Sequence, residues 1–166
     1  MGPHGPARRR PDGRGSAADL DWRVIRELKA GATHLAYKAM LELRPEIGPE
    51  SVFAEHVDNN LRPEGYRLVG FFVKEDTFAA AVAGFRVIHM LAWGHELYCD
   101  DLGTRFEHRR KGYAGQLMDW MIEEAKRLHL DAFHLDSGLG PDRADAHRLY
   151  FDKGMRIAAF HFSRSV

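Results

Sequence analysis

The sequence predicts an α/β (α+β) fold with one mixed central sheet and helices on both faces. Three apolar runs, residues 66–74, 78–92 and 96–104, follow one another with only short turns between them. Strands joined by short turns pair antiparallel, so these runs predict a meander. The third run leads through a glycine-rich turn into a helix-period segment at 114–128 and an apolar run at 132–137. Such a strand–helix–strand unit predicts a right-handed parallel crossover.

The composition describes an ordinary globular domain. Of 166 residues, 45% are hydrophobic, and 24 basic and 24 acidic side chains give a formal net charge of +0. This balance argues against a protein specialised for nucleic acid or membrane surfaces, which is usually basic. The single cysteine, Cys99, excludes an internal disulfide and indicates a reducing compartment. With no run of about 18 apolar residues and no secretory signal, we expect a cytoplasmic protein.

The N-terminal residues differ from the rest. Residues 1–18 are rich in glycine, proline and arginine and lack apolar periodicity. They predict a disordered tail, followed by a single domain at 19–166. The run Arg8-Arg9-Arg10 could contact nucleic acid. A solvated tail is the favoured interpretation, because no aromatic residues are interleaved with the arginines.

The elements before the meander are a short strand and two helices. Alternating apolar residues predict the strand at 21–28. Apolar residues at helical spacing predict a helix over 31–43, and Pro45 follows its end. A second helix is expected over 49–59, because proline suits the first position of a helix.

The elements after the meander complete the domain. Gly84 marks a candidate bulge within the second meander strand. The methionines of the 114–128 helix lie on its apolar stripe, which assigns them to the core rather than to a metal. Asp142 can cap a helix that Gly154 closes. Residues 156–162 predict a final strand.

The glycine-rich turn is the strongest functional signal. It consists of Arg109-Arg110-Lys111-Gly112-Tyr113-Ala114-Gly115. Small residues at a helix start leave backbone N–H groups uncovered, and the helix dipole favours an anion there. The turn therefore predicts a diphosphate cradle; the alternative is a basic surface loop that caps a helix. It matches neither the Walker loop nor the dinucleotide Gly-x-Gly-x-x-Gly pattern.

The pattern Arg109-x-x-Gly112-x-Ala114 resembles the acyl-CoA signature of the GNAT superfamily of N-acyltransferases. Leu149-Tyr150-x-x-x-Gly154-Met155 is similar to the family's Leu-Tyr-x-x-x-Gly-Phe segment, and Tyr98-Cys99-Asp100-Asp101-Leu102 to its fourth strand. The order of predicted elements also agrees, over about residues 20–165. Segments around His134, His147 and His161 resemble a bacterial subgroup of unknown substrate.

The chain departs from the family pattern at a few positions. Phe106 replaces a common proline before the cradle, and Met155 replaces the phenylalanine. Arg143 stands where many members have an asparagine that contacts the cofactor. The core signature is intact.

The resemblance implies acetyl-CoA as acyl donor and direct attack by a primary amine. The backbone of Leu102, Gly103 and Thr104 would position the thioester, and Gly103 would allow the cofactor to approach closely. Tyr150 would protonate the leaving thiolate; the alternative is a core tyrosine. The residues implied for the pyrophosphate are Arg109, Arg110, Lys111, Gly112, Tyr113, Ala114 and Gly115.

Acidic residues supply the acceptor side of the predicted site. Asp100 and Asp101 are adjacent, so we expect them to face opposite sides of the strand, one of them into the cleft. That carboxylate would aid deprotonation of an ammonium, and Asp101 is the best single candidate. Asp136, from the next strand, would lie nearby and contact the substrate. Alternatively, Asp136 caps a loop and Asp101 pairs with Arg105 or Arg109.

Other assignments stay open. His147 could bind substrate or act as a base, although most buried histidines are simply hydrogen-bonded. The three histidines His134, His147 and His161 lack a compact metal-binding spacing, so we predict no metal. The rival to an enzyme is a catalytically silent CoA-binding or sensing module. The acceptor, the length of the acyl group and the oligomeric state are left open, a homodimer being one option.

Overall fold

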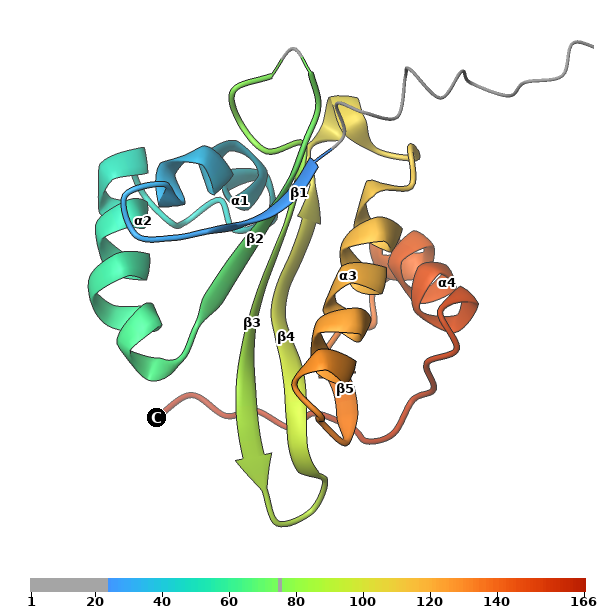
Figure 1. Ribbon diagram of the computed structural model, residues 1–166. Coiled ribbons are helices and arrows are strands. Elements are labelled where there is room, and N and C mark those ends of the chain that lie inside the picture. The colour runs from blue at the N-terminus through green and yellow to red at the C-terminus, as the bar shows by residue number, and fades with distance from the viewer. Residues whose placement is uncertain (1–23, 75) are drawn as a thin grey trace, which may run out of the picture.

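The computed structural model describes residues 24–74 and 76–166 (Figure 1). Within them, a five-stranded sheet has the spatial order β1-β2-β3-β4-β5. The first three pairings are antiparallel and β4–β5 is parallel, which confirms the predicted mixed sheet. The predicted tail at 1–18 lies outside the described residues. The strands are β1 (Val24–Leu28), β2 (Arg67–Phe72), β3 (Ala81–Met90), β4 (Gly94–Thr104) and β5 (Ala132–Leu135).

Helices cover both faces of the sheet, as predicted (Figure 1). The expected helix at 31–43 is divided into a 3₁₀ turn and α1, and the next helix continues past α2 through short π and 3₁₀ turns. The helical elements are η2 (Thr33–Ala36), α1 (Tyr37–Leu43), α2 (Glu50–His56), η3 (Val57–Leu61), η4 (Arg62–Glu64), η5 (Phe106–His108), α3 (Tyr113–Arg127), η6 (Pro141–Arg143) and α4 (Ala144–Asp152).

Two hydrophobic cores lie on opposite faces of the sheet. Successive residues of β2 alternate between them: Phe71 packs toward α3, and Leu68 and Phe72 pack toward α1 and α2. The methionines Met118 and Met121 of α3 are fully buried in the first core, as expected. Each such side chain contributes about 1.5–3 kcal/mol by burial. A strand buried on both faces explains the continuous apolar run of β2.

An irregularity in β4 changes the direction of one acidic side chain. Gly84 pairs with Asp101 and Phe85 pairs with Cys99, so Asp100 has no partner opposite it in β3. The bulge expected at Gly84 is present, and the extra residue lies on β4. A bulge breaks strict alternation. The expectation that Asp100 and Asp101 face opposite sides is therefore wrong, and both reach one group of polar side chains.

The predicted final strand at 156–162 is not formed. After α4, Gly154 turns the chain with φ 77°, and Met155 packs against the first core. Beyond Met155, the backbone makes no hydrogen bond with any described residue. The alternating sequence favours a strand, but a strand forms only beside a partner edge. No described strand lies alongside this segment.

Among the described residues, we find no helix with the length and apolar character needed to cross a bilayer.

Candidate active site

A pocket opens where β4 and β5 separate. The two strands pair only as far as Cys99 and Leu135, and β4 continues to Thr104. Beyond Cys99, this edge of β4 has no described strand partner, so its N–H and C=O groups can bond a ligand. The pocket has a volume of about 270 Å³. It is lined by Leu43, Arg44, Cys99, Asp100, Leu102, Leu135, Asp136, Ser137, Gly138, Arg143 and Tyr150.

Not all predicted residues of β4 face the pocket. Leu102 lines it, whereas a Cβ on Gly103 would lie 3.3 Å from Cβ of Leu43. Gly103 thus permits close approach of α1, and its predicted role beside the cofactor stays a prediction. The carbonyl oxygen of Thr104 accepts a hydrogen bond from Nε of Arg109 at 3.2 Å.

The predicted cradle stands at the start of α3. Gly112 is the N-cap, with φ 80°, and a Cβ added there would meet nothing within 4 Å. The backbone N–H groups of residues 110–115 make no hydrogen bond to any described residue. Gly115 instead allows α3 to approach α4, since its Cβ would lie 3.4 Å from Leu149. Free amides at a helix start, open to solvent at Gly112, form an anion-binding arrangement.

The same turn carries three cationic side chains. Arg110 lies 3.3 Å from Asp145, and Lys111 donates to the carbonyl oxygen of Glu107 at 2.8 Å. Arg109 lies 3.7 Å from Glu42. The side chains of Arg110 and Arg109 are 81% and 54% exposed, so their ion pairs with carboxylates are weak. A phosphate can therefore replace the carboxylate partners.

The two neighbouring carboxylates differ in their partners. Asp101 accepts a 2.8 Å hydrogen bond from the phenol of Tyr66 and a 3.1 Å hydrogen bond from Nε of Arg44. Asp100 lines the pocket; its Oδ2 is buried, lies 3.5 Å from Nε of Arg86, and has no hydrogen-bond partner among the described residues. Burial raises the pKa of Asp100; the charge of Arg86 opposes this shift, and the charge of Asp101 adds to it. Asp100 is thus the carboxylate suited to accept a proton.

Tyr150 forms another wall of the pocket. It is 9% exposed, and burial raises its pKa, although Arg143 and Ser137 oppose the shift. His147, three residues before it, does not line the pocket. Its Nε2 lies 3.1 Å from Oγ of Ser137 and 2.9 Å from the carbonyl oxygen of Gly138. His147 therefore fixes the loop that follows β5.

Asp136 lines the pocket, and its side chain is half-exposed. Its Oδ2 is 2.9 Å from Nδ1 of His161 in the C-terminal segment. Burial and the nearby carboxylate of Asp136 raise the pKa of Tyr98, on β4. Asp136 therefore connects β4, β5 and the C-terminal segment. The described residues contain no group of three or more metal-ligating side chains that could hold an ion.

Sequence reasoning missed two residues of the site. Arg44 and Tyr66 both hold Asp101, yet they lie 57 and 35 positions away from it in the chain. Arg44 follows the end of α1 and Tyr66 precedes β2, and neither position has a spacing signal. Only the tertiary fold brings them together.

The strands of the parallel crossover thus separate beside an anion-binding helix start, the arrangement expected from the resemblance to the GNAT superfamily. Comparison with known proteins agrees: the model described as "Acetyltransferase (GNAT) family" matches residues 33–155. The chain belongs to this family of acetyltransferases, which confirms the predicted fold and enzyme class.

A curated relative agrees with this assignment, and solved structures share the fold. The chain is 33% identical over 132 residues to "Uncharacterized N-acetyltransferase YhdJ" of Bacillus subtilis (strain 168), covering 79% of this chain and 89% of that protein. The solved ribosomal-protein-alanine N-acetyltransferase from Brucella melitensis biovar Abortus 2308 has a TM-score of 0.69 at 19% identity, covering 87% and 99% of the two chains. A Trypanosoma brucei acetyltransferase has a TM-score of 0.72 at 14% identity, covering 87% and 99%.

Proposed function

We propose that this protein transfers an acetyl group from acetyl-CoA to a primary amine that enters the pocket as an ammonium ion. The observation that supports an ammonium most directly is Asp100, a residue of the pocket wall whose Oδ2 lies 3.5 Å from Nε of Arg86 and has no hydrogen-bond partner among the described residues. A buried carboxylate oxygen without a partner is costly. A cationic amine would supply the missing donor.

The residues present fit acetyl-CoA. The free amides of residues 110–115, with Arg109, Arg110 and Lys111, would hold the diphosphate, and the unpaired edge of β4 would bond the pantetheine arm. When bound, acetyl-CoA would supply a thioester carbonyl for attack. Backbone groups of β4 at Leu102, Gly103 and Thr104 would position this thioester. Gly103 also packs under α1.

The proton transfers are assigned to two side chains. Asp100 accepts the proton of the ammonium, directly or through water, and its raised pKa favours this role. Asp101, held by Tyr66 and Arg44, contributes the neighbouring negative charge. Tyr150 donates its proton to the departing thiolate, and its raised pKa keeps the phenol protonated at neutral pH.

Asp136 and His147 complete the acceptor side. Asp136 lines the pocket and attracts the cation, while His147 holds Ser137 and Gly138 in position. Arg143 also lines the pocket and stands near Tyr150, where it stabilises developing thiolate charge.

An amine-panel assay tests the proposal. The panel contains a linear diamine, a lysine-containing peptide, a free amino acid and a peptide N-terminus, with matched alcohols as non-cationic controls. Free CoA thiol should appear with at least one amine and with none of the alcohols. Binding of acetyl-CoA without thiol release for any amine would instead indicate a silent CoA-binding module.

A glycine variant tests the cradle separately. Gly112→Asp places bulk and negative charge at the free amides, so acetyl-CoA binding measured by calorimetry should be lost. Gly65→Asp is the matched control, because Gly65 also has a positive φ, 89°, and open space around its Cβ. It should bind acetyl-CoA as tightly as the unchanged protein. Tight binding by Gly112→Asp would locate the diphosphate elsewhere.

A further inference from the structure

The cradle, residues 109–115, contains a backbone conformation that needs support from outside. Arg110 has φ 62° although it carries a Cβ, and Gly112 follows with φ 80°. The left-handed region is unfavourable for a residue other than glycine, and it persists only where the surroundings fix it. Since α3 begins at Tyr113, the helix itself does not fix Arg110. The segment before the cradle must supply this support.

Two side chains of the cradle reach back to that segment. Nζ of Lys111 donates to the carbonyl oxygen of Glu107 at 2.8 Å. Nε of Arg109 donates to the carbonyl oxygen of Thr104 at 3.2 Å. Glu107 belongs to η5, and Thr104 is the last residue of β4. The position of the cradle therefore depends on the position of η5 relative to β4.

A buried ion pair attaches η5 to the connection between β2 and β3. Arg105, the residue before η5, is 7% exposed and pairs with Asp76 of this connection and with Glu107. Asp76 also accepts a 3.0 Å hydrogen bond from the backbone N–H of Phe78. Nε2 of His108, the last residue of η5, lies 3.4 Å from the same Asp76 oxygen that holds Arg105. Figure 1 shows the connection and η5 side by side beyond the end of β4.

The burial of this ion pair makes it a firm attachment. Burial alone would raise the pKa of Asp76, but hydrogen bonds from the N–H of Phe78 and from Arg105 lower it below its ordinary value. The carboxylate is therefore charged where it meets Arg105. Separating a buried pair leaves a buried charge without a partner, whereas an exposed pair separates easily. Asp76 thus holds η5 more firmly than the exposed pairs of Arg109 and Arg110 hold the cradle.

We propose that Asp76 is a positioning residue for acetyl-CoA, which acts through Arg105 and η5 to hold the cradle in the conformation that binds the diphosphate. This inference rests on the proposed function and adds to it a residue that does not line the pocket. The pantetheine arm would be bonded by β4, which does not depend on Asp76. The effect of Asp76 is therefore confined to acyl donors that carry a diphosphate.

Calorimetry of acetyl-CoA binding tests the role of Asp76. Asp76→Asn removes the charge and places an amide N–H against Arg105, so binding should weaken about ten-fold, on the order of one hydrogen bond. Asp58→Asn is the matched control. The side chains of Asp58 and Asp76 are both 20% exposed, and each accepts hydrogen bonds from one backbone N–H and one arginine. Asp58→Asn should lower stability but leave the affinity for acetyl-CoA unchanged.

A shortened acyl donor separates positioning from general damage to the fold. S-Acetylpantetheine carries the thioester and the pantetheine arm but no diphosphate. For Asp76→Asn, kcat/KM should fall about ten-fold with acetyl-CoA. With S-acetylpantetheine, kcat/KM should equal that of the unchanged protein. A merely structural role of Asp76 would lower both values together.

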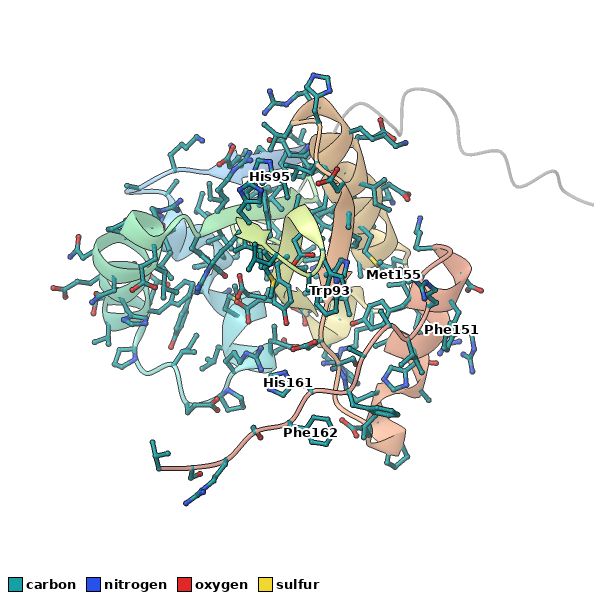
Figure 2. All side chains as sticks on the ribbon, turned by 90° about the horizontal axis from the view of Figure 1, so that it is seen from below. Trp93, His95, Phe151, Met155, His161 and Phe162 are labelled. Carbon is teal, nitrogen blue, oxygen red and sulfur yellow. The ribbon has the colours of Figure 1, made fainter. Side chains whose placement is uncertain are left out.

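Amide hydrogen exchange of the free protein tests the attachment itself. The N–H groups of His108 and Arg109 donate to the carbonyl oxygens of Arg105 and Phe106 at 2.8 and 3.2 Å. Both amides should exchange faster in Asp76→Asn. The amide of His95, labelled in Figure 2, is the internal reference, because it donates to Asp131 at the opposite end of β4 and should be unaffected.

A double variant covers the case in which Asp76→Asn fails to fold. Asp76→Asn/Arg105→Met leaves no buried guanidinium without a partner, so it should fold, and it should bind acetyl-CoA as weakly as Asp76→Asn. If the unchanged protein binds acetyl-CoA and these variants bind it equally tightly, Asp76 has no positioning role and the proposed function stands. Equal losses with both acyl donors would also overturn the positioning role. An unchanged protein that does not bind acetyl-CoA would overturn the proposed function and, with it, the role of Asp76.

Discussion

Tyr66 donates a 2.8 Å hydrogen bond from its phenol to the carboxylate of Asp101, joining the residue that precedes β2 to β4. The ring is 3% exposed, and burial, together with the charge of Asp101, raises the pKa of Tyr66 well above its usual range. Gly84, opposite Asp101 on β3, makes room for this ring. A Cβ at Gly84 would lie 1.7 Å from the phenol oxygen.

The first prediction is that Gly84→Ala destabilises the fold. The buried ring of Tyr66 cannot move away cheaply, so overpacking should lower the free energy of unfolding by about 1–3 kcal/mol. Denaturant unfolding measures the change. Tyr66→Leu removes the ring. Gly84→Ala should therefore lower the free energy of unfolding less in the Tyr66→Leu variant than in the unchanged protein. Additive losses would show that the two residues do not compete for space.

The second prediction concerns a charged network that ties α3 to the sheet. Glu124 of α3, whose side chain is 8% exposed, accepts hydrogen bonds from Arg127 and lies 2.7 Å from Arg67 of β2. Arg67 also bonds both carboxylate oxygens of Glu27 on β1 at 3.0 Å. Glu124→Gln should lower the free energy of unfolding at neutral pH by roughly 1–3 kcal/mol.

The loss of unfolding free energy in Glu124→Gln should depend on pH in a definite direction. Hydrogen bonds from Arg127 and Arg67 lower the pKa of Glu124 from 4.5 to about 2. A carboxyl group whose pKa is lowered in the folded state stabilises the folded protein at pH values above its unfolded-state pKa. That contribution is lost as the pH falls through its folded-state pKa. The stability difference between the unchanged protein and Glu124→Gln should therefore shrink between about pH 4.5 and pH 2. Glu123→Gln, in an exposed pair with Lys126, is the control and should change little.

The sequence predicted those parts of the fold that depend on local periodicity. The apolar stripe of α3 and the continuous apolar run of β2 identify a helix and a buried strand without knowledge of their partners. The bulge at Asp100 could not be predicted in detail, because it arises from the register between β3 and β4. The unpaired state of residues 156–162 was missed for a related reason: alternation identifies a strand but not the edge that it needs.

The third prediction is that Tyr150→Phe slows the chemical step without weakening acetyl-CoA binding. A proton delivered to a departing thiolate matters mainly in the transition state, and general acids contribute ~10²–10⁴-fold. Single-turnover kinetics should show this loss, while calorimetry gives unchanged affinity. Because burial raises the pKa of Tyr150 above 10, titration of this phenol should not reduce activity below pH 10. Tyr37→Phe removes a surface hydrogen bond to Gly48 and should have no effect. An unchanged single-turnover rate for Tyr150→Phe would reduce Tyr150 to a packing role.

The last prediction separates the two neighbouring carboxylates. Asp100→Asn keeps the shape of the side chain and removes the proton acceptor, so kcat/KM toward amines should fall ~10²–10⁴-fold and its acid limb should disappear. Acetyl-CoA affinity should not change. Asp101→Asn should lower kcat/KM less than Asp100→Asn does, since Tyr66 can still donate to the amide oxygen.

The pH profile distinguishes these roles more sharply than the rates do. Asp100 has a pKa raised above 3.8 by burial and by the charge of Asp101. Removing that charge with Asp101→Asn lowers the pKa of Asp100, so the acid limb of kcat/KM should move to lower pH. If Asp101→Asn instead abolishes the limb while Asp100→Asn retains it, then Asp101 removes the proton and Asp100 only attracts the cation. That outcome would require the ammonium to displace Arg44 or Tyr66, the two groups that occupy the Asp101 carboxylate.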